Sequence, residues 1–399
     1  MDRFFFRILY SLFFISIFSC EENPIIVENK NLPLDLDTLS FNVTKTINYK
    51  VEPAFGNLDT LFFGEHEGFK FHYTLVSFDT LSEDSDHSYN LYKDSLIVDS
   101  AEISLKSFSD TLISNQKFNL RYFPNFSDSV FKESEANFKN FTNYSLSSII
   151  SSSSMMVDSS DTTVMLKFVI DAGNIGKITG LSIDNFNLSF IVETSDEIEG
   201  SLKFHSSETI SGYYPRMKVF YKNSENDTIN FQKSFRSYDD ITIIEQPPME
   251  QSDTANIALG YAKGLKSLVY VDFDDFKLPD RGILKKAELI LNNVDIDSSS
   301  TFTIDSYPIE STGDYDVFNE FNEDPYGVDF TLMTTSNTIN GEVKINHRST
   351  LREISKGSRI NHGFKVESSP VNNIFKSTSF HNLNSKDLFP VMRVIYAIP

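Results

Sequence analysis

Apolar and polar residues alternate along most of this chain, in short runs that polar turns separate. Examples are TVMLKFVID at 163–171 and FNLSFIVET at 186–194. A period of two places successive side chains on opposite faces of a strand, so each run predicts a β-strand with one buried face. One run, RSTLREISKG at 348–357, instead has the spacing of a short helix that ends at Gly357. The pattern therefore predicts an all-β protein made of antiparallel sheets.

Several landmarks recur in the same order in the two halves of the chain. Each half starts with two glycines that three residues separate, continues with a strand ending in Phe-Asp, and then has a strand containing Ala-Glu. Each half closes with a strand that begins at a proline, PRMKVFY at 215–221 and PVMRVIY at 390–396. Between these landmarks, GSLKFHSSE at 200–208 is the expected counterpart of GFKVESSP at 363–370. Ordered self-similarity at this spacing predicts a duplication. The glycines are Gly64 and Gly68 in the first copy, and Gly260 and Gly264 in the second.

The duplication predicts two tandem antiparallel β-sandwich domains of the jelly-roll type. The first domain is expected at 40–222 and the second at 232–399. The segment between them, 223–231, is polar and is expected to be the linker.

The order of these landmarks resembles the DNRLRE family, a carbohydrate-binding-module family of secreted bacterial proteins. The resemblance implies a β-sandwich fold and points to glycan as a ligand. The matching positions are Val76-Ser77-Phe78-Asp79 and Val271-Asp272-Phe273-Asp274, then Ala101 and Ala287, and finally the strands that begin at Pro215 and Pro390.

The first residues have the form of a secretory signal peptide, expected at 1–19. Arg3 and Arg7 give it a basic start, and an apolar stretch follows that is shorter than the roughly 20 residues of a membrane-spanning helix. The stretch ends in Ile-Phe-Ser-Cys, which resembles the lipobox of bacterial lipoproteins. That resemblance implies that the thiol of Cys20 is acylated and that residues 20–39 form a tether from the lipid.

Acidic residues follow Cys20 at once. Glu21 and Glu22 resemble the export signal of Bacteroidetes-type lipoproteins, which implies a lipid-anchored protein of the outer membrane that faces the cell exterior. Because Cys20 is the sole cysteine, internal disulfides, thiolate metal sites and a cysteine nucleophile are excluded.

The net charge of the chain restricts the classes of partner that it can bind. With 56 acidic and 35 basic residues the net charge is −21, which repels phosphate backbones, so we expect no nucleic-acid partner. Carboxylate oxygens are good ligands for calcium, and Asp272 and Asp274 would share one face of a strand. They are the candidate calcium ligands, and calcium is the candidate cofactor.

Candidate ligand-binding residues are tyrosines in polar surroundings, because glycans stack on exposed aromatic rings. Tyr213 and Tyr214 precede the closing strand of the first half, and Tyr89 and Tyr92 lie in an acidic insertion. The chain contains no nucleotide-binding or hydrolase motif, so we expect a protein without enzymatic activity.

Three functional interpretations remain open at this point. The first is a non-catalytic surface binding or adhesion module, with glycan as its ligand. The second is a structural or assembly lipoprotein that binds other envelope proteins, which predicts an exposed apolar patch or a free sheet edge. The third and least favoured is a glycan-active hydrolase, which predicts two carboxylates that face each other across a cleft.

Overall fold

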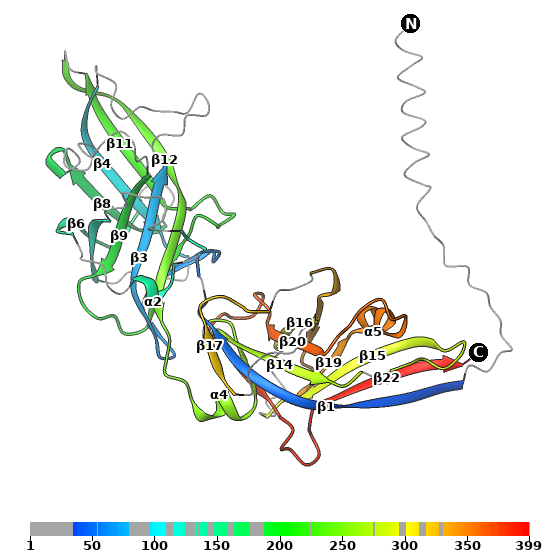
Figure 1. The fold of residues 1–399 in the computed structure, drawn as a ribbon. Helices are drawn as coiled ribbons and strands as arrows, with labels where there is room; N and C mark the ends of the chain where they lie inside the picture. Colours follow the sequence, from blue (N-terminus) through cyan, green and yellow to red (C-terminus); the bar gives the residue numbers. More distant parts are fainter. Residues whose placement is uncertain are drawn as a thin grey trace, which may run out of the picture.

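Antiparallel β-sheets dominate the computed structural model and confirm the predicted all-β class (Figure 1). Two β-sandwich domains follow one another, and short helices lie in the connections. In the part of the chain that the structure describes, no helix is both long and apolar enough to cross a membrane. The structure describes residues 35–53, 55–79, 96–108, 115–123, 132–134, 136–141, 147–158, 163–174, 187–223, 226–273, 276–294, 301–310, 317–326 and 330–398.

The first domain is built from one uninterrupted series of strands and the short helix α2 (Phe138–Phe141). Its strands are β2 (Thr60–His66), β3 (Phe69–Asp79), β4 (Leu96–Lys106), β5 (Lys117–Phe123), β6 (Ile149–Ser154), β7 (Met156–Val157), β8 (Val164–Asp171), β9 (Asn187–Thr194), β10 (Ser201–His205), β11 (Arg216–Asn223) and β12 (Asn226–Glu245).

The second domain combines the first strand of the chain with the last ten, and adds α4 (Gln251–Ala255), η1 (Phe330–Leu332) and α5 (Arg348–Ser355). Helix α5 confirms the helix that the sequence predicts at this place. The strands are β1 (Asp35–Val51), β13 (Ile257–Gly260), β14 (Leu265–Val271), β15 (Ile283–Asn292), β16 (Thr303–Ile309), β17 (Asn319–Phe321), β18 (Thr334–Asn337), β19 (Glu342–Asn346), β20 (Gly363–Ser368), β21 (Ser377–Phe380) and β22 (Val391–Ile398).

The strand orders of the two domains correspond over eight positions, and β7 of the first domain has no counterpart. The first is β6-β5-β9-β3-β12-β11-β4-β8-β7 and the second is β18-β16-β20-β14-β1-β22-β15-β19. The Phe-Asp strands β3 and β14, the Ala-Glu strands β4 and β15, and the closing strands β11 and β22 occupy equivalent places, which supports the duplication. One predicted match is wrong. GSLKFHSSE forms β10, which pairs with β2, whereas GFKVESSP forms β20, which pairs with β14 and β16.

The two repeats exchange their first strands. Strand β1 pairs with β22 over 35–42 and with β14 over 43–50, so it joins the two layers of the second domain. Strand β12 pairs with β11 over 226–236 and with β3 over 237–245, so it does the same in the first domain. Each sandwich is therefore completed by the strand that begins the other repeat.

Sheet membership thus differs from the expected division of the chain. The segment expected as a linker, 223–231, contains the last residue of β11 and the first residues of β12, which pair with each other. Residues up to Glu245 belong to the first sandwich. Residues from 40 to Val51 belong to the second sandwich. Both repeats start with an equivalent strand, and a period-two pattern does not specify the sheet that a strand joins.

The repeated glycines allow the exchanged strands to end close to a tight turn. Gly264 has a positive φ of 66°, and a Cβ there would lie 1.9 Å from the carbonyl oxygen of Val51 at the end of β1. Gly68 has a φ of 85°, and its Cβ would lie 3.3 Å from Pro247, just beyond β12. A side chain is excluded at Gly264 by both its backbone conformation and the neighbouring strand.

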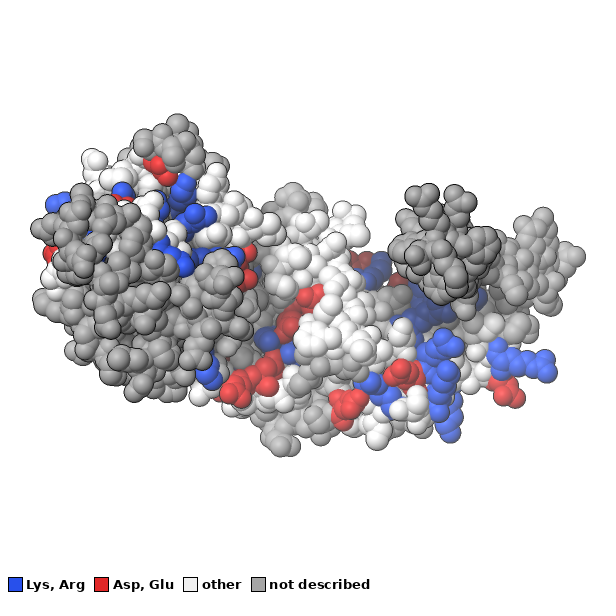
Figure 2. Space-filling model, turned by 90° about the horizontal axis from the view of Figure 1, so that it is seen from above, with Lys and Arg blue, Asp and Glu red and all other residues white. Residues whose placement is uncertain are grey.

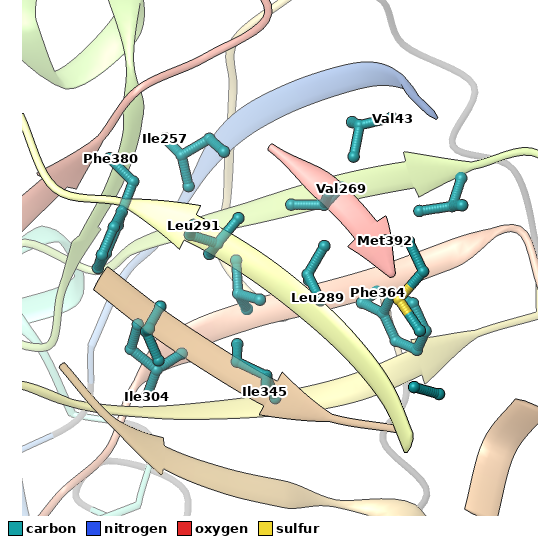
Figure 3. Packing of buried hydrophobic residues seen from close by; sticks show 14 of the residues in the cluster. Val43, Ile257, Val269, Leu289, Leu291, Ile304, Ile345, Phe364, Phe380 and Met392 are labelled. Carbon is teal, nitrogen blue, oxygen red and sulfur yellow. The ribbon is translucent and has the colours of Figure 1, made fainter. Parts of the chain in front are cut away.

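Each domain has its own apolar core between its two layers. Figure 3 shows the core of the second domain, where Val43 of β1 packs among side chains from both layers. A third cluster lies where the domains meet: Phe375 of the second domain packs against Phe62, Phe69 and Phe71 of the first, with ring centroids 5.2, 5.1 and 5.6 Å away. The labelled core residues of Figure 3 are Val43, Ile257, Val269, Leu289, Leu291, Ile304, Ile345, Phe364, Phe380 and Met392.

Candidate functional site

A large concave site lies on the second domain beside the start of the first, and we call it the junction cleft. Its volume is about 1090 Å³. In the view of Figure 2, acidic side chains form a band near the place where the domains meet. The side chains on which the argument below depends are Tyr261, Lys266, Asp305, Tyr307, Phe330 and Glu367.

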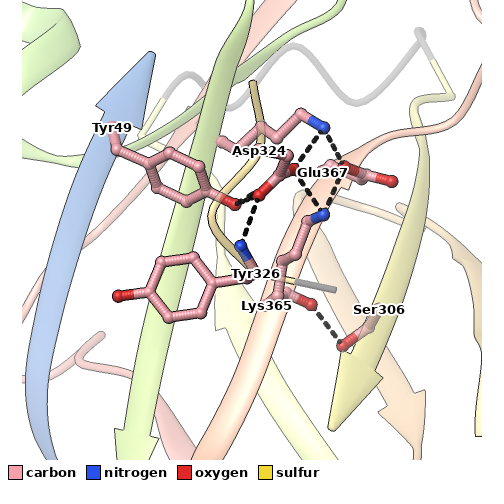
Figure 4. Close-up of polar contacts among 7 residues, drawn as sticks. Tyr49, Ser306, Asp324, Tyr326, Lys365 and Glu367 are labelled. Carbon is pink, nitrogen blue, oxygen red and sulfur yellow. Dashed lines mark hydrogen bonds and ion pairs between the residues drawn. The ribbon is translucent and has the colours of Figure 1, made fainter. Parts of the chain in front are cut away.

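The polar floor of the junction cleft is held by an ion-pair network (Figure 4). Lys365 is 2 % exposed, and its Nζ lies 2.6 Å from Asp324 Oδ2 and 3.4 Å from Glu367 Oε2. Lys266 contacts the same two carboxylates at 2.8 and 2.7 Å. A buried ammonium group requires such partners, because its desolvation is costly. The network therefore fixes the position of the Glu367 carboxylate.

The network also sets the charge state of its members. Burial lowers the pKa of Lys266, but the attraction of Glu367 and Asp324 is greater, and the net effect is a raised pKa. For Asp324, burial raises the pKa and the two lysines more than compensate, so its pKa is lowered. Tyr49 of β1 donates from its hydroxyl to Asp324 Oδ1 at 3.2 Å. The exchanged strand thus supports the network directly.

Tyr307 lies beside this network with its ring buried. Burial raises the pKa of its phenol, and the negative charges of Glu367 and Asp305 raise it further, so the hydroxyl stays protonated as a donor. Lys365 Nζ lies 5.5 Å from the centroid of its ring. The edge of the ring meets Phe330, with centroids 6.0 Å apart and planes at 89°.

Phe330 is the exposed aromatic ring of the junction cleft. It is 70 % exposed, although it packs edge-on against Tyr307. Tyr261 is half-buried in the same cleft, and its ring lies 6.4 Å from that of Phe55. Rings that are held by packing and are still open to solvent can stack on an apolar ligand face.

Two carboxylates lie close together on the floor of the cleft. Asp305 of β16 and Glu367 of β20 are direct partners in the register of these strands. Asp305 Oδ1 accepts a hydrogen bond from the hydroxyl of Thr335 at 2.5 Å, and Glu367 is paired with the lysines. The cleft therefore combines fixed carboxylates, a phenol whose hydroxyl is hydrogen-bonded to Glu367, and an exposed ring.

The predicted tyrosines Tyr213 and Tyr214 lie elsewhere, in a hollow on the first domain with a volume of about 520 Å³. Both rings are half-buried. The guanidinium carbons of Arg216 and Arg236 lie 4.7 and 4.3 Å from the centroid of Tyr214, and Lys106 Nζ lies 5.0 Å from that of Tyr213. The structure thus brings these two tyrosines together, and surrounds them with cations.

Of the remaining predicted site residues, the structure describes Asp272 alone. Strand β14 ends at Val271, so Asp272 lies just beyond the strand and not within it. Among the residues that the structure describes, no group of three or more His, Cys, Asp or Glu side chains could hold a metal ion. Four candidates lie outside the described residues: Cys20, Tyr89, Tyr92 and Asp274.

The first domain also holds a buried acidic cluster that the sequence does not reveal. Burial, followed by repulsion from Asp240 and Asp239, raises the pKa of Glu133 to about 8. Burial likewise raises the pKa of Asp240 to about 7, although its Oδ2 accepts hydrogen bonds from the Ser207 amide and the Ser237 hydroxyl at 2.8 and 2.9 Å. These groups bind protons near neutral pH.

Comparison with protein families and with curated proteins identified no relative of this chain. No protein-family model matches the chain, and no curated protein is significantly similar to it. The resemblances to the DNRLRE family and to a lipoprotein signal therefore stay predictions.

Proposed function

We propose that the protein is a lipid-anchored lipoprotein of the outer membrane, facing the cell exterior, that binds glycans without catalysing a reaction. The anchor is the acylated thiol of Cys20, and the two β-sandwiches form the part that binds. The duplicated sandwich architecture is compatible with this role, but a fold alone does not specify a function. The argument for a ligand comes from the junction cleft.

The observation that carries the proposal is an exposed ring above fixed polar groups. Phe330 is 70 % exposed and packs edge-on against Tyr307, while Asp305 and Glu367 line the same cleft as register partners. A sugar presents an apolar face for stacking and hydroxyl groups that donate to carboxylates. Since the ion pairs fix the acceptors before a ligand arrives, little ordering entropy is lost on binding.

The carboxylates of the cleft favour binding over hydrolysis. Glu367 contacts two lysines and Asp305 accepts from Thr335, so both have structural partners. A glycosidase needs one carboxyl group as a proton donor, with its pKa raised by its surroundings. In the cleft both carboxylates are instead engaged by side chains of the protein itself, Glu367 by two lysines and Asp305 by Thr335.

A screen on an array of neutral and acidic glycans tests the proposal. We expect binding that Phe330→Ala weakens at least tenfold, because the stacking ring is lost. Tyr307→Phe removes only the hydroxyl donor, and we expect a smaller loss. Tyr238, 40 % exposed on the first domain, provides the matched control: Tyr238→Ala should bind like the wild type.

An assembly lipoprotein is the second candidate, and the rim of the cleft favours it. Phe330, Met333 and Val371 are 70, 41 and 76 % exposed, and together they could pack against a partner protein. If no glycan binds, and Phe330→Ala instead abolishes the recovery of an envelope protein from the outer-membrane fraction, this second function replaces the first.

A further inference from the structure

The outward face of the first domain carries a group of basic residues that is separate from the junction cleft, and we call it the basic face. It is formed by β4, β8, β11 and β12 around the hollow of Tyr213 and Tyr214. In Figure 2, basic side chains gather on the first domain, at the left. The basic members are Lys106, Lys167, Arg216, Lys218 and Arg236, and the acidic ones are Glu102 and Asp158.

Two arginines of the basic face stand directly opposite each other. Arg216 of β11 and Arg236 of β12 are register partners, and both are exposed. Like charges in this position destabilise an antiparallel pair. A chain with 56 acidic residues could easily place a carboxylate there. The repulsion is retained instead, which indicates a use for two adjacent guanidinium groups.

The contacts of these arginines orient them without neutralising them. Both lie over the ring of Tyr214, and Arg216 also donates to the Tyr214 hydroxyl at 3.1 Å and to the Gly212 carbonyl at 3.4 Å. Arg236 donates to the carbonyl of Ser207. Among the described residues, every partner recorded for the two side chains is uncharged. Tyr214 therefore acts as a platform that holds two positive charges together.

The acidic residues of the basic face are already paired with other cations. Glu102 contacts Lys167 at 2.8 Å, and Asp158 contacts Lys106 at 3.2 Å. Among the described residues, the ion pairs of Glu102 and Asp158 therefore involve Lys167 and Lys106 and not Arg216, Arg236 or Lys218.

The geometry points to an acidic glycan as the ligand of the basic face. We propose that a sugar ring bearing a carboxylate or sulfate enters the hollow, and that its anionic group binds Arg216 and Arg236. Guanidinium groups bind such oxyanions through two parallel hydrogen bonds. The hollow also presents apolar surface at Met156 and Val157, which are 44 and 49 % exposed. This combination suits a sugar ring with one charged substituent.

The rest of the molecule disfavours other polyanions. Nucleic acids carry a charge every few ångströms and need a long basic track, whereas the basic face is one concave patch on a chain of net charge −21. A glycan with one charge per ring meets less repulsion from the remaining surface. The inference does not rest on the proposed function of the junction cleft, because the two sites share no residue.

Isothermal titration of the full chain with defined polymers tests the inference. The probes are polygalacturonate for carboxylate, dextran sulfate for sulfate, unmodified dextran as the neutral polymer, duplex DNA, and vesicles of anionic phospholipid. We expect binding to at least one acidic glycan, none to dextran, and weakening as salt is raised. The variant Arg216→Gln/Arg236→Gln should lose at least tenfold in affinity.

Two controls keep this result interpretable. The exposed Arg352 of α5 gives a charge-matched variant, and Arg352→Gln should bind like the wild type. We expect little change in the Tm of the double variant, because relief of the like-charge contact offsets the loss of contacts to Tyr214 and Ser207. A measured Tm close to that of the wild type excludes unfolding as the cause of lost binding. Phe330→Ala should leave this binding intact, which separates the basic face from the junction cleft.

Three results would overturn the inference. Equal affinity of the double variant and Arg352→Gln would show that the arginine pair is not the site. Equal binding of dextran and the acidic polymers, or no binding to any glycan, would remove the anionic glycan as ligand. Preferential binding of DNA or of anionic vesicles would assign the face to a different class of partner.

Discussion

Strand β1 should be indispensable to the second domain, although it precedes the whole first domain in the chain. It lies between β14 and β22 and connects the two layers. A fragment of residues 247–399 lacks it, whereas a fragment of residues 55–246 contains every strand of the first sandwich. We therefore expect the first domain to fold as an isolated fragment and the second to require β1.

The burial of β1 gives the magnitude. Val43, Ile47, Tyr49 and Val51 are 5, 4, 0 and 9 % exposed. Each large apolar side chain contributes about 1.5–3 kcal/mol when it is buried, so the four together contribute about 6–12 kcal/mol. The net stability of a domain is about 5–15 kcal/mol. Loss of the strand removes most or all of this, and also exposes the edges of β14 and β22.

Urea unfolding of both fragments, followed by far-ultraviolet circular dichroism, measures the effect. We expect a cooperative transition for 55–246 and none for 247–399. Adding a peptide of residues 35–52 should restore a transition whose midpoint rises with peptide concentration. The matched control is the same peptide with Ile47→Asp, which should not restore it. A cooperative transition of 247–399 alone, unchanged by the peptide, would refute the strand exchange.

Two further predictions concern buried charges. Lys365→Met leaves Asp324 and Glu367 without one of their cations. Breaking a buried pair costs about 3–5 kcal/mol, which urea unfolding would detect. Adding Asp324→Asn should recover part of the lost stability, and strict additivity of the two changes in unfolding free energy would contradict the network. Burial raises the pKa of Glu133 to about 8 and that of Asp240 to about 7. At a pH above the ordinary pKa of a carboxyl group, the folded state therefore binds more protons than the unfolded state. The free energy of unfolding should therefore fall as the pH rises from about 4 to about 8, and the fall should be smaller in Glu133→Gln and in Asp240→Asn; an equally steep fall in both variants would contradict the assignment.

The local features of the fold could be predicted from the sequence because their causes are local. Alternating runs such as 163–171 specify strands, and the pattern at 348–357 specifies α5, whose last residues precede Gly357 with its positive φ of 69°. The duplication was visible because equivalent strands keep their landmark residues in both copies. These signals need no information about distant partners.

The exchange of strands could not be predicted, because β1 and β12 are equivalent and each fits the same place in either sandwich. The polar residues at the start of β12 also have the composition of a linker. The wrong match of GSLKFHSSE with GFKVESSP has a similar origin, since each segment starts with a glycine and has two consecutive serines near its end. Local patterns identify a strand but do not identify its neighbours.

The junction cleft was missed because its residues come from distant parts of the chain. Tyr49, Asp324 and Lys365 meet only after β1 has crossed to the second domain. One signal was present: Lys365 and Glu367 alternate with Phe364 and Val366 in β20, which places two charges on one face of an otherwise buried strand. Tyr213 and Tyr214 lie together in a hollow, but their cationic neighbours Lys106 and Arg236 come from other strands, which a local sequence pattern does not reveal.

Glycan binding in the junction cleft can be observed most directly by nuclear magnetic resonance, on protein whose phenylalanine and tyrosine rings are labelled with ¹³C. The resonances of Phe330 and Tyr307 can be assigned through Phe330→Leu and Tyr307→Phe. On titration with a glycan selected from the array, these resonances should shift with saturation, and those of Tyr238 should not. Saturable binding of the glycan that leaves Phe330 and Tyr307 unshifted would contradict the account.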